Sequence, residues 1–216
     1  MLLRSTAQVV SWIFHPLMIL TYMICLSMII NPYAFGINQI GEGRSTILIM
    51  YVFLQATLIP GISISMMKTL GLVPDWNMEG RYAKIGPFIA AGILYLWLFI
   101  NFNRLPDVPP AFKTAILGTV LALFTAFVLT LLTKISLHAV GMGSLVGMII
   151  ITMLLYSYNT FQWGDQMYSL YTVLFGTVIL AGLVGSARLI LRRMSMQELA
   201  MGYIVGFATQ LIALQF

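Results

Sequence analysis

Long apolar runs alternate with short polar breaks throughout the chain. Dividing it at charges, glycine and proline clusters and asparagine-rich turns leaves apolar segments that cover 7–30, 46–69, 86–102, 112–133, 135–156, 167–190 and 197–216. Each approaches the roughly 20 residues with which an α-helix crosses a bilayer. A secretory signal is a single short segment, and the strands of a membrane barrel would alternate apolar and polar residues. The pattern therefore predicts an all-α polytopic transmembrane bundle of about seven helices.

The amino-acid composition agrees with this pattern. Hydrophobic residues make up 60% of the chain and charged residues only 8%, against roughly 25% charged residues in a soluble domain. No soluble domain, low-complexity tract or repeat interrupts the apolar segments, so we expect one membrane domain over 1–216. Pro60 should kink its helix. Small residues spaced for close helix packing occur at Gly143 with Gly147 and at Gly202 with Gly206.

Polar residues gather on one side of the predicted bundle. Loops that follow even-numbered helices emerge on the side of the N-terminus, which places 70–85, the turn at Lys134 and 191–196 on one face. These loops and their flanks hold most of the unusual polar residues: Asp75, Glu79, Arg81, Lys84, Lys134, Ser136, His138, Arg188, Arg192, Arg193 and Glu198. Arg192 and Arg193 are typical of solvated loop charges. The convergence of the three loops predicts a candidate site on this face.

Arg188 and His138 lie about one turn inside apolar segments. An arginine at such a depth costs on the order of 3 kcal/mol, so it either faces a partner or a wet cavity, or extends to the interface. A histidine in a helix either makes a packing hydrogen bond or takes part in chemistry. The remaining histidine, His15, precedes Pro16 in the first segment and is expected to pack.

The spacing around these residues resembles the type 2 phosphatidic acid phosphatase and haloperoxidase superfamily, whose membrane members remove phosphate from lipid phosphates and pyrophosphates. The third motif of that family, SRxxxxxHxxxD, aligns with Ala187, Arg188, Met194 and Glu198, and the second, PSGH, aligns with Ile135, Ser136, Leu137 and His138. The first motif fits best between Glu79 and Pro87, where only Pro87 matches, although Arg81 and Lys84 lie in the same loop. The resemblance covers 79–206 and implies a six-helix phosphatase-like core.

This resemblance assigns roles to several residues. It implies catalytic roles for His138, as proton donor to the leaving group, and for Glu198, as the acid that orients the nucleophile. It implies phosphate binding by Arg188, Ser136, Arg81 and Lys84.

Met194 stands where the family has its nucleophilic histidine. A thioether has no proton to remove and forms no stable phosphoryl adduct, so the covalent route of the family is lost. The resemblance then implies weak or no phosphatase activity, together with a basic pocket that can bind a phosphorylated lipid headgroup. Two alternatives remain: a non-catalytic membrane subunit or a small transporter. Gln55 and Thr57 are few polar residues for a transporter.

Other features bear on cofactors and partners. Two distant histidines and the single Cys25, which we expect to pack, make no credible metal site, so no cofactor is expected. A net charge of +5 in a membrane protein favours anionic lipid headgroups over nucleic acid. A membrane protein partner or a homo-oligomer is left open.

We expect the protein to be integral to a bacterial inner membrane. About eight basic residues lie on the N-terminal side against about three opposite, which favours a cytoplasmic site. Leaving out the candidate site charges gives four against three, so the side of the membrane stays open.

Overall fold

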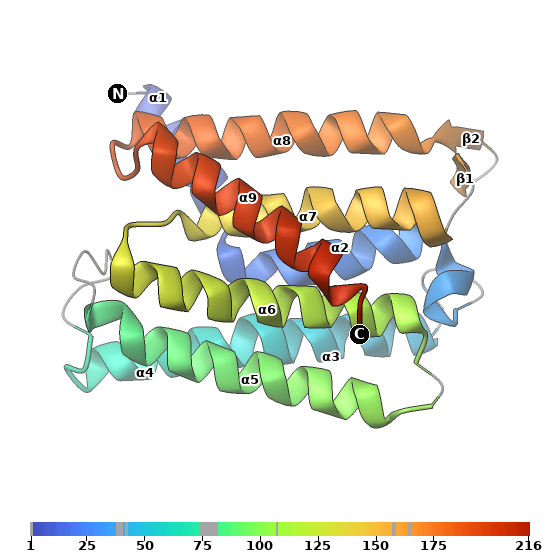
Figure 1. The fold of residues 1–216 in the computed structure, drawn as a ribbon, viewed down its shortest axis with the longest axis horizontal. Helices are drawn as coiled ribbons and strands as arrows, with labels where there is room; N and C mark the ends of the chain where they lie inside the picture. The colour runs from blue at the N-terminus through green and yellow to red at the C-terminus, as the bar shows by residue number, and fades with distance from the viewer. Residues whose placement is uncertain are drawn as a thin grey trace.

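The chain folds as a bundle of helices that run roughly parallel to its long axis, with the last helix, α9, crossing the others obliquely (Figure 1). The computed structural model describes residues 2–37, 41, 43–73, 82–106, 108–156, 159–163 and 166–216. An all-α polytopic bundle, as the apolar pattern predicts, is confirmed. Segments of different helical geometry and one short hairpin complete it.

The elements follow in chain order. The α-helices are α1 (Leu2–Ile13), α2 (Pro16–Ile30), α3 (Gly43–Phe53), α4 (Ile59–Thr69), α5 (Ile85–Arg104), α6 (Pro110–Leu132), α7 (Leu137–Ile151), α8 (Leu170–Ile190) and α9 (Met196–Ala213). Segments of 3-10 helix cover Pro32–Phe35 and Tyr82–Lys84, and π-helical segments cover Leu54–Leu58 and Thr152–Tyr156. The strands β1 (Thr160–Trp163) and β2 (Gln166–Ser169) pair antiparallel between α7 and α8.

Five helical stretches of the described chain are long and apolar enough to cross a membrane. They are Gly43–Thr69, Ile85–Arg104, Pro110–Leu132, Leu137–Tyr156 and Leu170–Ile190, and α1 with α2 makes a sixth only as a pair bent by 62°. The seventh predicted segment does form a helix, α9, but it is not among these candidates. By length and composition alone, the described residues thus contain five or six candidate spans.

Pro60 lies where the helical geometry changes from π to α, and the helical stretch continues past it. A π-helical segment, Leu54–Leu58, immediately precedes α4, and Pro60 occupies the first turn of that helix. Proline tolerates this place because an N–H there needs no partner within the helix. The stretch Gly43–Thr69 therefore continues as one candidate span.

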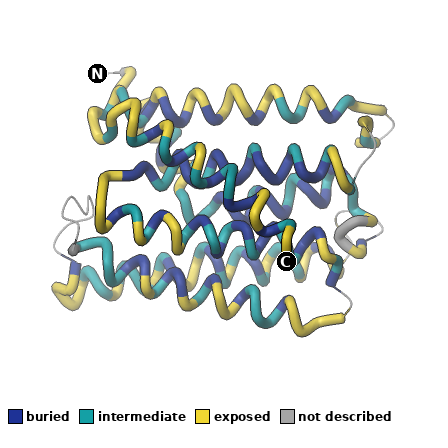
Figure 2. Tube along the Cα trace, in the orientation of Figure 1, coloured by how far each residue is buried: buried dark blue, intermediate teal, exposed yellow. Residues whose placement is uncertain are grey.

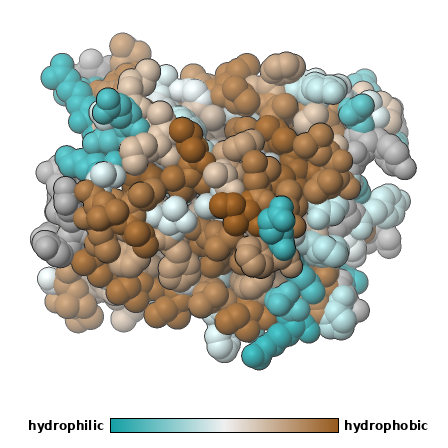
Figure 3. All heavy atoms as spheres, viewed as in Figure 1, coloured by the Kyte–Doolittle hydropathy of each residue, from teal (hydrophilic) through white to brown (hydrophobic). Residues whose placement is uncertain are grey.

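The burial pattern separates a protein core from an outer apolar surface. Figure 2 shows α7 mostly buried and α8 mostly exposed. Hydrophobic side chains cover the middle of the face in Figure 3, and hydrophilic ones lie mainly toward its two ends. An exposed apolar surface of this extent is typical of a protein whose helices are surrounded by lipid.

Close packing of α9 on α7 depends on glycines, as the small-residue spacing predicts. A Cβ at Gly206 would lie 1.9 Å from the Val140 carbonyl oxygen, and one at Gly202 would lie 2.7 Å from the Ser136 carbonyl oxygen. On α7, a Cβ at Gly143 would lie 2.3 Å from the Tyr203 carbonyl oxygen. The two backbones are in direct contact, and this contact sets the position of the α8–α9 turn.

Candidate functional site

Two of the polar loops that the sequence places on one face lie at the same end of the bundle. The α6–α7 turn and the α8–α9 turn are both at the left in Figure 1, where α5 begins. Two of the residues predicted there, Lys84 and Arg188, are close enough for their charges to interact. Arg81, together with Asp75 and Glu79, lies outside the described residues.

The contact between α7 and α9 brings the second and third motif regions together. The Ser136 N–H donates to the Glu198 carbonyl oxygen across 3.4 Å. Gly202, one turn further along α9, faces the Ser136 carbonyl. The start of α7 and the start of α9 are therefore neighbours, although they are more than 50 residues apart in the chain.

Ser136 and Glu198 both have local roles as helix caps. Ser136 is fully buried and caps α7, where its Oγ accepts from the Ala139 N–H at 3.4 Å. Glu198 belongs to a capping box at the start of α9: the Ser195 N–H donates to its Oε2 at 2.7 Å, and the Glu198 N–H donates to the Ser195 Oγ at 3.3 Å. Caps satisfy amide groups that a helix start leaves unpaired, so both side chains have a structural reason to be there. Their implied chemical roles stay predictions.

His138 is tied to α1. Its Nε2 lies 3.0 Å from the Ser11 carbonyl oxygen, and because a carbonyl only accepts, Nε2 carries the proton and donates it. The neutral ring then presents Nδ1 as an acceptor. The implied role of His138 as a proton donor would have to use an Nε2 proton already bonded to the main chain, or a protonated Nδ1.

His15 is the residue of this site that sequence reasoning assigns to packing alone. Its ring lies edge-on to His138, with centroids 6.0 Å apart and planes at 77°, and the charge of Arg188 acts on both rings. The sequence feature that could have indicated this position is the His15-Pro16 dipeptide, because proline disfavours a helical conformation in the residue before it. The break before Pro16 turns α1 away from α2, and His15 lies beside His138 at the start of α7.

Arg188 lies in the last turn of α8 and is half-buried. Its Nε is shielded from solvent and has no hydrogen-bond partner within the described part of the chain. Buried N–H donors are nearly always paired, so an unpaired guanidinium N–H calls for an acceptor from elsewhere. A guanidinium presents its donors in a planar fork that matches the oxygens of a carboxylate or a phosphate.

Lys84 adds a second half-buried cation beside Arg188. Burial lowers the pKa of Lys84, and the positive charges of Lys134 and Arg188 lower it further, while Glu198 acts in the opposite direction. Lys134 itself is exposed in the α6–α7 turn. The electrostatic balance at Lys84 is thus one in which an added anion would be favourable.

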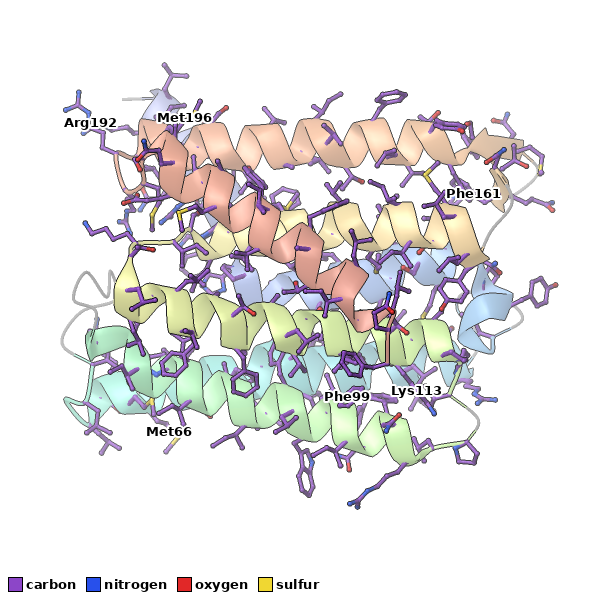
Figure 4. All side chains as sticks on the ribbon, viewed as in Figure 1. Met66, Phe99, Lys113, Phe161, Arg192 and Met196 are labelled. Carbon is purple, nitrogen blue, oxygen red and sulfur yellow. The ribbon has the colours of Figure 1, made fainter. Side chains whose placement is uncertain are left out.

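The arginines of the α8–α9 turn differ from each other. Arg192 points away from the bundle (Figure 4), is exposed, and has a positive φ of 52° in the tight turn. Arg193 is also exposed, but its charge acts on Arg188 and on His138. Met194 is half-buried in the same turn. Arg193 therefore contributes to the field of the site, and Arg192 has the geometry of a solvated loop charge.

A small cavity elsewhere in the bundle is too small for a headgroup. It is lined by Thr114, Thr152, Tyr156 and Gln210, among others, and lies toward the opposite end of α7 from His138. Within the described residues, no group of three or more His, Cys, Asp or Glu side chains is placed to hold a metal ion. The basic end, with its cations and its unpaired donor, is the stronger candidate for a binding site.

None of the protein-family models, curated proteins or solved structures that were compared with this chain matches it. The likeness to the phosphatase superfamily consequently stays a prediction from the motif spacing.

Proposed function

We propose that this integral membrane protein binds the phosphorylated headgroup of a lipid at its basic end, with weak or no phosphatase activity. The observation that carries the proposal is the half-buried Arg188, whose buried Nε has no partner among the described residues. Lys84 and Arg193 lie within electrostatic range of Arg188, and Lys134 lies within electrostatic range of Lys84. A phosphate supplies both the acceptor oxygens and the negative charge that this arrangement would use.

The position of the site favours a ligand with an apolar tail. Arg188 belongs to a span whose outward side chains are exposed, including Leu183 and Ile190 close by in the chain. Leu132, which precedes Lys134, is 66% exposed. A lipid could place its acyl chains along these surfaces and its headgroup on the cations. Free phosphate has the same head chemistry without the apolar contribution.

Binding without efficient catalysis follows from Met194. A thioether cannot replace the imidazole as a nucleophile toward phosphorus. The Nε2 proton of His138 is bonded to the Ser11 carbonyl oxygen. Neither residue supplies what hydrolysis by the route of the resembled family would require.

The test is lipid binding by the purified protein in detergent or nanodiscs, with native mass spectrometry as the readout. We expect a short-chain phosphatidic acid to bind more tightly than phosphatidylcholine of the same chains. Arg188→Gln should weaken phosphatidic acid binding by about tenfold, the value of one lost charge-assisted hydrogen bond. Arg104→Gln, which removes a charge at the end of α5, is the matched control and should leave binding unchanged.

Additional measurements on the same preparations distinguish the alternatives. Competition by millimolar inorganic phosphate as effective as by the lipid would show that the acyl chains contribute nothing. Equal binding of the two lipids, or equal loss in Arg188→Gln and Arg104→Gln, would contradict the proposal. Phosphate release should be weak or absent in the native protein. An activity that appears only in Met194→His would show that the histidine absent from position 194 is what the native protein lacks for hydrolysis. The non-catalytic subunit and the small transporter remain alternatives without a specific contact in their favour.

A further inference from the structure

We propose that α1 is an interfacial helix, lying in the boundary between headgroups and acyl chains on the side of the membrane that carries the basic end, without crossing the bilayer. This inference goes beyond the proposed lipid binding and does not depend on it. It rests on the bend between α1 and α2, on three distinct faces of α1, and on the place of Trp12.

The bend limits how deep α1 can reach. The helix α1 precedes α2 and is bent from it by 62°, across the break at Phe14 and His15. Twelve residues make a helix of about 18 Å, so with α2 along the membrane normal α1 covers only about 8 Å of depth. The 15 residues of α2 cover about 22 Å of the roughly 30 Å hydrocarbon core. The roughly 8 Å left beyond α2 is the outermost part of the hydrocarbon core, next to the headgroups, and an interfacial helix buries its apolar face to this depth.

The three faces of α1 meet three different surroundings. Each is marked by a pair of residues four apart, which share one side of a helix. Ala7 and Ser11 are buried, which marks the face that packs on the bundle, where α8 is the main contact. The exposed apolar face carries Val9 and Ile13, and the exposed polar face carries Arg4 and Gln8.

This division is not what a transmembrane helix requires. A helix surrounded by acyl chains would be apolar on both exposed faces, and a helix in water would have no reason to expose Val9 and Ile13. A polar face and an apolar face side by side fit a helix that lies in the plane of the interface. Arg4 then adds a positive charge at the level of anionic headgroups.

Trp12 lies where the two exposed faces meet. It is 80% exposed, and helical spacing places it between Gln8 on the polar side and Val9 on the apolar side. An indole prefers the membrane–water interface because its ring is apolar and its single N–H is polar. Trp12 also lines an open surface groove with Ser5, Gln8, Val9 and Ile13.

Two hydrogen bonds hold α1 at a defined level of the bundle. His138 donates from Nε2 to the Ser11 carbonyl oxygen at 3.0 Å, and Tyr22 donates from its hydroxyl to the Ile13 carbonyl oxygen at 3.0 Å. The last turn of α1 is therefore fixed to the start of α7 and to the first turns of α2. Because His138 belongs to the basic end, α1 and that end share one depth.

The depth of Trp12 can be measured in the full-length protein. In a variant carrying Trp76→Phe, Trp97→Phe and Trp163→Phe, Trp12 is the only tryptophan left, and it can be quenched by phosphatidylcholines brominated either near the carbonyl or near the chain end. We expect stronger quenching by the shallow bromines. The matched variant that keeps only Trp97, inside the α5 span, should show the opposite order. Stronger quenching of Trp12 by the deep bromines, or by neither lipid, would overturn the proposal.

Cysteine labelling tests the two exposed faces independently. In a Cys25→Ser background reconstituted in vesicles, Gln8→Cys should react with a membrane-impermeant thiol reagent and Val9→Cys should react at least about tenfold more slowly. Slow reaction at both positions would indicate a buried or transmembrane α1, and fast reaction at both would indicate a helix in water. An unchanged gel-filtration profile of both variants shows that they are folded.

Discussion

At the scale of single residues, the basic end combines groups that are unfavourable together in the absence of an anion. Lys84 and Arg188 are both half-buried, and their charges repel. Ser136 and Glu198 bond to main-chain amides as helix caps, and the charge of Glu198 offsets the repulsion at Lys84 only in part. Such an arrangement lowers stability and is retained where binding requires it. The effect of these cations on stability and their effect on binding can be measured separately.

Replacing Lys84 should raise stability and weaken binding at the same time. Its pKa is lowered in the folded protein, so its charged form opposes folding at neutral pH, and this penalty disappears as the pH rises through the folded pKa toward 10.5. Lys84→Gln should therefore raise Tm at pH 7 by about 1–2 °C, since solvent screens a half-exposed group. The gain should shrink toward pH 10.

Thermal unfolding in detergent at several pH values, with phosphatidic acid binding measured in parallel, provides the check on Lys84→Gln. Arg104→Gln serves again as the control, with no pH-dependent gain expected. A Tm below that of the native protein at pH 7 would mean that Lys84 stabilises the fold through a contact and is not simply a repelled charge.

At the scale of elements, the contact of α7 with α9 positions the site. Helices of this chain are apolar on most sides, so the hydrophobic pattern does not specify which faces meet. The glycines do, because only at Gly143, Gly202 and Gly206 can the two backbones approach this closely. The same contact places the Ser136 N–H against the Glu198 carbonyl oxygen.

A methyl group at this contact should separate the two helices. At Gly206 a Cβ would meet the main chain at Val140 and Ser144, which cannot turn aside as a side chain could. We expect Gly206→Ala to destabilise the protein by about 2 kcal/mol or more. Gly182→Ala in α8, where nothing lies within 4 Å, is the matched control and should be neutral or slightly stabilising. Denaturation of both variants in mixed detergent micelles measures the difference; equal stability would show that α9 packs elsewhere.

At the scale of the whole molecule, α9 decides how many times the chain crosses the membrane. It is not among the apolar candidate spans, yet it traverses the bundle from the basic end, packed on α7 and α6 (Figure 1). Gln210 is fully buried on α9, where protein surrounds it instead of lipid. Polar residues inside a bundle are tolerated in this way, and they lower the apolar signal of the helix.

We therefore expect the α6–α7 turn at the basic end and the C-terminus after α9 to lie on opposite sides of the membrane. In a Cys25→Ser background, a cysteine replacing the exposed Lys134 should be labelled from one side, and a cysteine replacing the exposed Phe216 should be labelled from the other. Impermeant and permeant thiol reagents applied to cells and to inverted vesicles distinguish the sides. Labelling of both positions from one side would show that α9 does not cross.

The helical bundle and the residues at its basic end could be predicted from the sequence, because a bilayer restricts helix length and the placement of charges. Helix length and the cost of placing charge in hydrocarbon predict the bundle. Counting the loops on each side predicts that Lys84, Lys134 and Arg188 lie at the same end. The capping box at Ser195 and Glu198, which we did not predict from the sequence, has a local signature, a serine followed three residues later by a glutamate. Each of these depends on local spacing alone.

Other features only the tertiary structure decided. Three features depend on the angle and register at which helices pack: the edge-on contact of His15 with His138, the Arg188 Nε that has no partner among the described residues, and the burial of Gln210 on α9. Helices with apolar residues on nearly every side carry little information about that angle, since lipid and protein neighbours accept the same side chains. The sequence by itself determined that the chain is an all-helical bundle of apolar helices and predicted a cluster of cations at one end; packing decided which polar groups meet there.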